Sequence, residues 1–370
     1  MFLICVQFLG WHLPLPYNCL LMILHNTIDK EILKRKLHEE SYKRRTLSFY
    51  RYVTLENLDA LRDELWLMWN ELNVFGRVYI AKEGVNAQIS VPEHNWDSFV
   101  ERLYTYPPFK DVPFKIAVED NGKSFYKLIV RIRKKIVADG LPDDFFDTNN
   151  VGTHLNATEW NQAMDLPDTT VVDIRNHYES EVGHFKGAIL PDADTFKAEM
   201  EMVTDLLKGK EDEKVLLYCT GGIRCEKASA YLRHSGFKDV NQLHGGIIAY
   251  AAEIQEKGLE SKFVGKNFVF DERKGERITE DVISQCHQCG KPCDNHTNCE
   301  NKQCHLLFIQ CEECSEKMQG CCTPECVAII NLPIEEQRTL RKGNQKDHAH
   351  SVYKSRLRPN LREVLSMMKR

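Results

Sequence analysis

The stretch KVLLYCTGGIRC, residues 214–225, predicts a buried strand that runs through a tight loop into a helix. Four apolar residues precede Cys219, two glycines follow it, and a charged, helix-favouring segment begins at Arg224. Backbone N–H groups in such a loop point inward and the helix N-terminus adds positive potential, so a thiol placed there ionises readily. Gly221 and Gly222 allow the backbone to curl around the sulfur. We therefore expect Cys219 to be a reactive thiol rather than a packed structural cysteine.

Strands and helices alternate around this loop and predict an open, mostly parallel, doubly wound sheet over residues 141–265. The segments 171–175 and 240–246 are typical of further strands, and 227–237 of a helix that ends at a glycine. Ligands of such sheets bind beyond the carboxyl ends of the strands, which is where Cys219 lies.

Residues 26–140 predict a smaller α/β unit in which strands and helices follow the order βαββαβ. The expected strands cover residues 46–53, 76–81, 86–91, 115–118 and 125–132, and the expected helices 57–72 and 96–103. This order is typical of a ferredoxin-like plait. A polar turn within it, made of Lys82, Glu83, Gly84 and Asn86, is compatible with a surface that faces RNA or with a plain hairpin turn.

The charge of the chain is informative only through its distribution. Its 370 residues have a net charge of −5, which argues neither for nor against an anionic partner. Residues 131–135, RIRKK, form one basic cluster, and a basic tail over residues 331–370 holds ten lysines and arginines from Arg338 onward. Either segment is compatible with a solvated face or with binding to nucleic-acid phosphates.

The first 25 residues are apolar but are broken by Gly10, Pro14 and Pro16 and have no basic start. They predict a poorly ordered extension rather than a signal peptide or an anchor. We expect no membrane association and a cytoplasmic location.

Ten of the fourteen cysteines fall within residues 266–330 and predict a metal-binding unit. Two Cys-x2-Cys knuckles are separated by 21 residues, a spacing close to that of a zinc ribbon, and they comprise Cys286, Cys289, Cys311 and Cys314. Ten cysteines would serve two zinc ions, or one zinc ion and redox thiols. Iron–sulfur ligation is less favoured because the spacing matches neither common ferredoxin run, and cysteine packing without metal is the alternative.

The middle unit resembles a rhodanese domain. The resemblance is carried by residues 171–193, by the loop after residue 218 and by LHGGIIAY, residues 243–250. It implies that Cys219 carries sulfur as a persulfide, within a supporting loop of Thr220, Gly221, Gly222, Ile223 and Arg224. Related phosphatases place an arginine six residues after the cysteine, whereas here the sixth position is Cys225, which disfavours that activity.

Three further residues of this unit have expected roles. Asp173 and Arg175 match the Asp-x-Arg of rhodaneses and are expected to form a structural ion pair that holds the loop. His184 is expected to be structural as well. Cys225 either resolves a persulfide or sulfenic acid on Cys219 as a disulfide, or is a packed helix cysteine.

From about residue 46 to 330, the whole chain resembles the bacterial rhodanese-containing tRNA uridine hydroxylases. The segments that show this resemblance are GRVYIAKEGVNAQISVP (76–92), YCTGGIRCEKASAYL (218–232) and the cysteine pattern. The resemblance implies an acylphosphatase-like plait, a central rhodanese domain and a Cys-rich segment. It further implies oxygen-dependent formation of 5-hydroxyuridine at the wobble uridine of tRNA, with molecular oxygen as co-substrate and the anticodon loop as partner.

The expected chemistry is addition of a thiolate or persulfide at Cys219 to C6 of uracil. No flavin, haem or NAD signature is recognised in the sequence. One alternative is a thiosulfate-type sulfurtransferase that uses the same cysteine and takes sulfur from a donor. Another is a non-catalytic zinc-ribbon RNA-binding protein, which the intact cysteine loop argues against.

Overall fold

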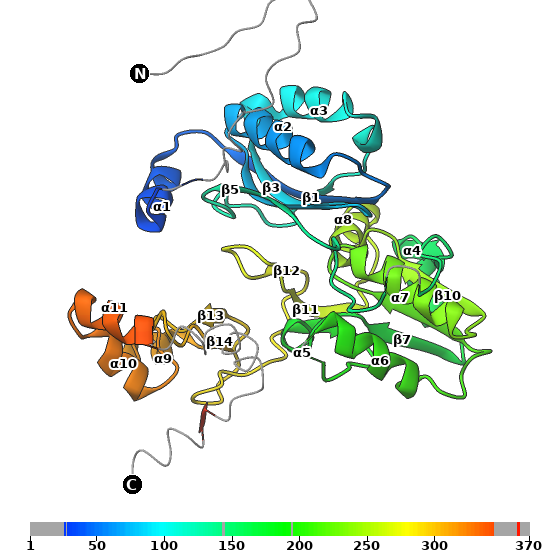
Figure 1. Cartoon of the computed structure of the whole chain (residues 1–370). Coiled ribbons are helices and arrows are strands. Elements are labelled where there is room, and N and C mark those ends of the chain that lie inside the picture. The colour runs from blue at the N-terminus through cyan, green and yellow to red at the C-terminus, as the bar shows by residue number, and fades with distance from the viewer. Residues whose placement is uncertain (1–25, 27, 143–144, 194, 344–360, 363–370) are drawn as a thin grey trace, which may run out of the picture.

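The computed structural model of the chain contains three units that follow one another along the sequence (Figure 1). It describes residues 26, 28–142, 145–193, 195–343 and 361–362. The predicted extension over residues 1–25 lies outside the described residues, as does most of the predicted basic tail. Among the described residues, none of the helices has the length and apolar character needed to span a membrane.

The first unit confirms the predicted ferredoxin-like plait. Its sheet has the strand order β4-β1-β3-β2-β5, in which only β2 and β5 are parallel. The elements are α1 Lys30–Glu39, β1 Arg44–Tyr52, α2 Leu58–Glu71, β2 Phe75–Ala81, β3 Gly84–Pro92, η1 Glu93–Asn95, α3 Trp96–Tyr104, η2 Pro107–Phe109, β4 Lys115–Ile116 and β5 Leu128–Ile132. The expected strand over 115–118 is therefore only two residues long.

The two faces of this sheet differ because its strands alternate apolar and polar side chains. Phe49 of β1 and Val78 of β2 are buried in one core with Trp69 of α2 and Phe99 of α3. Both long helices therefore cover one face, as Figure 1 shows. The opposite face carries polar and aromatic side chains from β1 and β3, and it is turned toward the second unit.

The second unit confirms the predicted doubly wound sheet. Its four parallel strands have the order β6-β10-β9-β7. One core lies between this sheet and helices α6 and α7, and another between the sheet and helices α4 and α8. The elements are β6 Thr153–Leu155, α4 Ala157–Met164, β7 Thr169–Asp173, α5 His177–Ser180, β8 Gly183–Phe185, α6 Phe196–Leu206, β9 Lys214–Tyr218, α7 Ile223–His234, β10 Asp239–Leu243, α8 Gly246–Lys257, β11 Phe263–Asn267 and β12 Glu276–Arg277.

A separate antiparallel sheet, with the order β12-β11-β8, was not expected and leads into the third unit. The third unit contains the cysteine cluster and is built from short elements. These are β13 His296–Asn298, β14 Leu307–Ile309, α9 Glu312–Lys317, α10 Pro324–Ile330 and α11 Ile334–Gly343. The confirmed fold is thus a plait, a rhodanese-type α/β domain and a Cys-rich segment.

The plait is joined to the second unit by a buried ionic cluster. Lys227 of α7 is 1% exposed and contacts the carboxylates of Glu83, at 3.0 Å, and Asp139, at 2.7 Å. Glu83 belongs to the polar turn for which a surface facing RNA was one interpretation. Its carboxylate faces α7 instead, because the buried ammonium needs compensating negative charge.

Candidate functional site

The reactive loop begins where β9 ends. All four apolar residues before Cys219 are fully buried in the parallel sheet, so the strand delivers the cysteine to the carboxyl edge. Helix α7 starts at Ile223, one residue before the helix-favouring segment that the sequence predicts from Arg224. The backbone N–H of Gly222 donates to the Cys219 sulfur at 3.1 Å. Gly222 has a φ of 93°, and an added Cβ would lie 2.8 Å from the Tyr50 hydroxyl, so a glycine is needed here on two counts.

The Cys219 thiol is shifted toward its ionised form. Burial opposes ionisation, but it is outweighed by a hydrogen bond from the Cys225 thiol, by the positive charge of Arg224 and by backbone N–H donors of α7. Together these lower the pKa of Cys219 to about 6. Burial and the adjacent Cys219 sulfur raise the pKa of Cys225, which therefore stays protonated as a donor. At neutral pH Cys219 is mostly a thiolate, the nucleophilic form.

The Arg224 side chain is held in place by an ion pair with a buried carboxylate. Its guanidinium makes two parallel 2.8 Å hydrogen bonds to Glu179 of α5, whose side chain is fully buried. Although burial opposes ionisation, Arg224 lowers the pKa of Glu179 below its ordinary value. Glu179 also accepts a 3.4 Å hydrogen bond from Thr220. The loop is thus tied to α5 by a charged pair and a hydroxyl.

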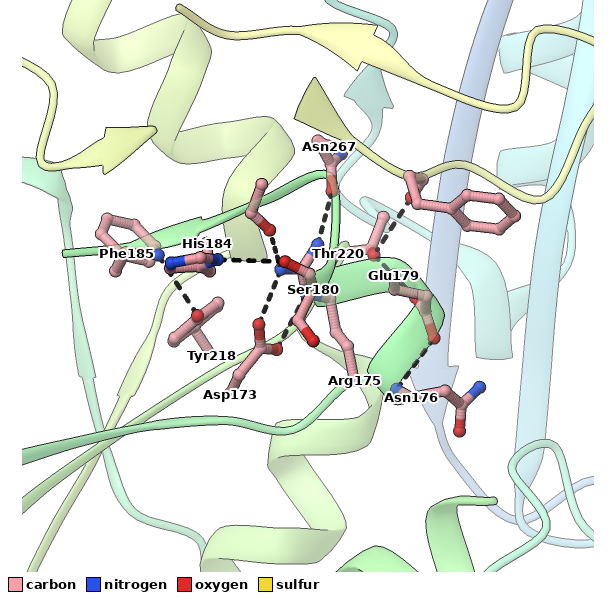
Figure 2. Close-up of polar contacts among 12 residues, drawn as sticks. Asp173, Arg175, Asn176, Glu179, Ser180, His184, Phe185, Tyr218, Thr220 and Asn267 are labelled. Carbon is pink, nitrogen blue, oxygen red and sulfur yellow. Dashed lines mark hydrogen bonds and ion pairs between the residues drawn. The ribbon is translucent and has the colours of Figure 1, made fainter. Parts of the chain in front are cut away.

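Asp173 and Arg175 form a second buried ion pair next to α5 (Figure 2). Arg175 donates to both carboxylate oxygens of Asp173 at 2.8 and 2.7 Å, and also to the backbone carbonyl of Gly183 at 2.6 Å. Neither side chain of the ion pair is exposed. The His184 ring of β8 lies 3.0 Å from the Ser180 carbonyl of α5, to which its Nδ1–H donates. These residues hold α5 and β8 around the loop without lining the cavity described below.

Two residues of the plait complete the site, and the sequence analysis missed both. Tyr50 of β1 donates to Glu226 of α7 at 2.9 Å, and the Lys115 ammonium lies 4.1 Å from the centre of the Tyr50 ring. An added Cβ at Gly221 or Gly245 would lie 3.9 or 3.6 Å from carbons of Lys115, so this side chain extends across the loop. Burial lowers the pKa of Lys115 to about 8, against the opposing effect of Cys219.

A cavity of about 590 Å³ lies between the two units and includes the reactive loop in its lining. Its volume is within the ordinary range for sites that hold a small ligand, roughly 300–1,000 Å³. The plait contributes Lys115 and a row of side chains from its helix-free face, which comprises Ser48, Tyr50, Tyr79, Asn86 and Gln88. The rhodanese-type domain contributes Cys219, Thr220, Gly221, Ile223 and Arg224. Neither unit forms this cavity alone.

The predicted basic cluster over 131–135 lies at the edge of this cavity. Arg131, Arg133 and Lys134 are at least partly exposed, while Ile136 and the residues after it line the cavity. Arg133 lies against Tyr79, a residue of the lining. The positive charge of these side chains therefore lies beside the cavity and favours an anion there.

The two predicted knuckles meet in the third unit. The sulfur atoms of Cys286, Cys289, Cys311 and Cys314, the first cysteine group, all lie within 4.8 Å of one another. The Cys311 backbone N–H donates to the Cys286 sulfur at 3.4 Å, an interaction that stabilises a thiolate. Four converging thiolates are a donor set that can hold a metal ion.

Family models match most of the chain in the order of its units. A UPF0176 acylphosphatase-like domain matches residues 44–136, a rhodanese-like domain residues 156–253, and a rhodanese C-terminal region residues 264–327. Among solved structures, a rhodanese-like domain from Anabaena sp. is 22% identical, covers 30% of this chain and 78% of its own, and has a TM-score of 0.25.

Two curated relatives are similar over nearly their full length. A tRNA uridine(34) hydroxylase from Leptospira interrogans is 59% identical over 341 residues, which are 92% of this chain and 93% of that protein. One from Yersinia enterocolitica is 54% identical over 324 residues, 87% and 93% of the two chains. Identity of this extent across all three units shows common descent, and the chain belongs to the tRNA uridine(34) hydroxylase family.

Proposed function

We propose that this protein hydroxylates the wobble uridine of tRNA at C5, with molecular oxygen as co-substrate and Cys219 as nucleophile. The observation that carries the proposal is a cysteine with a pKa of about 6 in a cavity that the plait and the rhodanese-type domain share. A thiolate in a shared cavity suits a reaction in which the plait binds the uracil base and the cysteine of the rhodanese-type domain attacks it. The relatives named above supply the substrate class.

In the proposed reaction the Cys219 sulfur forms a bond to C6 of uracil, and the electron pair of the C5–C6 double bond moves toward C5 and O4. The enriched C5 then bonds to one oxygen atom of O2, which gives a hydroperoxide on C5. A thiol reductant supplies two electrons that break its O–O bond, so that one oxygen atom stays on C5 as a hydroxyl and the other leaves as water. Loss of the C5 proton and expulsion of the sulfur restore the double bond. Overall, uridine, O2, two electrons and two protons become 5-hydroxyuridine and water, and we assign the two electrons to a thiol reductant that is oxidised to a disulfide.

Lys115 is suited to stabilise the negative charge that develops on the base when the sulfur adds. Its pKa of about 8 leaves it mostly protonated at neutral pH, and it lies across the loop that carries Cys219. Removing one such donor from an active site typically costs about 10²–10³ in kcat. Replacing Lys115 by Met should therefore lower kcat by about that factor, whereas Lys110→Met, an exposed lysine of the same segment, should not.

An anticodon loop is a suitable partner because single-stranded bases can be splayed out and inserted into a pocket. Arg131, Arg133 and Lys134 at the cavity edge would bind its phosphates.

We also infer that the first cysteine group holds Zn²⁺, the usual ion for four thiolates. His287 stands in the chain between Cys286 and Cys289, and its ring lies 3.0 Å from the Glu181 carboxylate. Glu181 directly follows helix α5, which carries Glu179, the partner of Arg224. The ion would thus help to position the reactive loop.

A thiosulfate sulfurtransferase is the second candidate, because the same six-residue loop would accept sulfane sulfur on Cys219. That activity needs neither tRNA nor oxygen. It also gives no role to the polar face of the plait in the cavity wall. We therefore rank it below hydroxylation.

The test uses bulk tRNA from cells that lack this gene, incubated with the full-length protein and a dithiol reductant under 18O2. Nucleoside mass spectrometry should detect 5-hydroxyuridine that carries one 18O atom with the wild type and none with Cys219→Ala. Absence of the nucleoside with the wild type, together with thiocyanate formation from thiosulfate and cyanide, would replace hydroxylation with sulfur transfer. A product with oxygen from water would overturn the proposed role of O2.

A further inference from the structure

A second set of four cysteines converges in the third unit, apart from the two predicted knuckles. The sulfur atoms of Cys299, Cys304, Cys322 and Cys326, the second cysteine group, all lie within 4.8 Å of one another. None of these residues belongs to a Cys-x2-Cys knuckle, since four and three residues separate the members of its two pairs. The spacing alone therefore did not single them out among the ten cysteines.

The distances within this group are those of ligands around one ion. Cys304 and Cys322 have their sulfurs 3.5 Å apart, and Cys322 and Cys326 3.8 Å apart. A disulfide has a sulfur–sulfur distance of about 2.05 Å. Four sulfurs at about 2.3 Å from a tetrahedral zinc ion are about 3.8 Å from each other. The first cysteine group shows a similar separation, with 3.6 Å between the sulfurs of Cys289 and Cys311.

Polar groups around the second cysteine group are directed at its sulfurs. The buried Asn301 amide donates to the Cys326 sulfur at 3.3 Å, and the Cys322 backbone N–H donates to the Cys299 sulfur at 3.5 Å. The latter repeats the hydrogen bond of the Cys311 N–H to Cys286 in the first group. Donors to sulfur stabilise the thiolate and orient it, as the surroundings of metal ligands do.

We propose that the second cysteine group binds its own Zn²⁺ ion, so that this unit holds two ions in an interleaved arrangement. Along the chain the cysteine pairs alternate between the groups. The first and third pairs, Cys286/Cys289 and Cys311/Cys314, make one site, and the second and fourth pairs, Cys299/Cys304 and Cys322/Cys326, make the other. Each ion therefore joins two segments of the chain, and between those segments lies one cysteine pair that binds the other ion.

The apolar content of the unit supports a structural role for both ions. The buried cluster around the second group has seven members, of which four are cysteines and only three are Leu306, Phe308 and Leu361. The strands here have three residues each, and helix α10 has seven. So small a core supplies little folding free energy, and units of this kind depend on a metal or disulfides. Because the ligand pairs alternate, loss of one ion should loosen the other site.

The test is the metal content of the purified full-length protein and the 113Cd NMR spectrum after cadmium exchange. We expect two zinc ions per chain and two cadmium resonances, both in the range of four-thiolate sites. Cys326→Ala should lower the zinc content to one ion or fewer. The matched control is Cys321→Ala, a buried cysteine beside the second group but outside it, and it should keep two.

One zinc ion per chain in the wild type, one four-thiolate resonance, or iron with visible absorption would each overturn the proposal. So would equal loss of zinc from the Cys321 and Cys326 variants. If Cys326→Ala does not fold, the stoichiometry and spectrum of the wild type decide the question. The second zinc site does not depend on the proposed function, since both readouts are independent of tRNA.

Discussion

Cys225 was expected either to resolve an oxidised Cys219 or simply to pack in a helix, and the structure suggests a third role. It lies in the first turn of α7, fully buried, with its protonated thiol donating to the Cys219 sulfur. Among the effects that lower the pKa of Cys219, this hydrogen bond is the largest. Replacing Cys225 by Ala removes the donor, whereas Cys225→Ser replaces it with a hydroxyl donor of similar size.

The expected size of the effect follows from the strength of a hydrogen bond to a charged group. Such a bond contributes about 1.5–3 kcal/mol, and 1.36 kcal/mol corresponds to one pKa unit, so the loss is worth roughly 1–2 units. The pKa of Cys219 should rise from about 6 to roughly 7–8 in Cys225→Ala. At pH 7 the thiolate fraction should fall from about 90% to about 10–50%. Cys225→Ser should stay near the wild type.

The assay is the rate of alkylation of Cys219 by iodoacetamide as a function of pH. Trypsin cleaves after Lys214 and Arg224, so the peptide VLLYCTGGIR contains Cys219 without any other cysteine. Mass spectrometry of that peptide therefore reports on one thiol among fourteen. The wild-type rate should reach half its maximum near the pKa of about 6.

An unchanged midpoint in Cys225→Ala would refute the argument that the Cys225 thiol stabilises the thiolate. An equal shift in Cys225→Ala and Cys225→Ser would refute it as well, because a hydroxyl can still donate. Thermal melts of both variants serve as the control for folding. A wild-type midpoint at or above the ordinary cysteine pKa of about 8.5 would contradict the lowered pKa itself.

Three further predictions concern stability and binding. The pKa of Cys219 in the folded state, about 6, is lower than the ordinary cysteine pKa of about 8.5. The contribution of the Cys219 thiolate to the stability of the fold is therefore complete above pH about 8.5 and is lost as the pH falls through about 6. The difference in melting temperature between the wild type and Cys219→Ala should therefore shrink as the pH is lowered from about 9 to about 6. Lys227→Met should lower the free energy of unfolding in a denaturant titration, because Asp139 and Glu83 each lose an ammonium partner. The loss should stay below the about 3–5 kcal/mol of an uncompensated buried charge, because Lys135 still contacts Asp139 at 2.8 Å. The three basic residues at the cavity edge are Arg131, Arg133 and Lys134. Replacing them by Ala should reduce the slope of log affinity for tRNA against log salt concentration by about one unit for each phosphate interaction removed. An unchanged slope would exclude them from the interface.

Much of the fold was predictable because its signals are local. Alternation of apolar residues with period two, or with helical spacing, indicates which side of an element is buried. This was enough for the plait and for the doubly wound sheet. The antiparallel sheet β12-β11-β8 was missed, and β4 is only two residues long, whereas the helix-favouring segment expected from Arg224 starts at Ile223. Element ends depend on caps and on neighbouring units, which periodicity does not report.

The sequence by itself determined that Cys219 follows a buried strand, that two glycines and a helix start surround it, and that two knuckles can share an ion. These features are set by residues within a few positions of one another. Only the tertiary structure decided that Lys115 lies over a loop more than a hundred residues later, and that eight cysteines sort into alternating groups. The periodicity of apolar residues indicates which face of the plait sheet is free of helices, but it does not indicate which other unit covers that face. That depends on how whole domains pack, a property of the folded chain and not of any one segment.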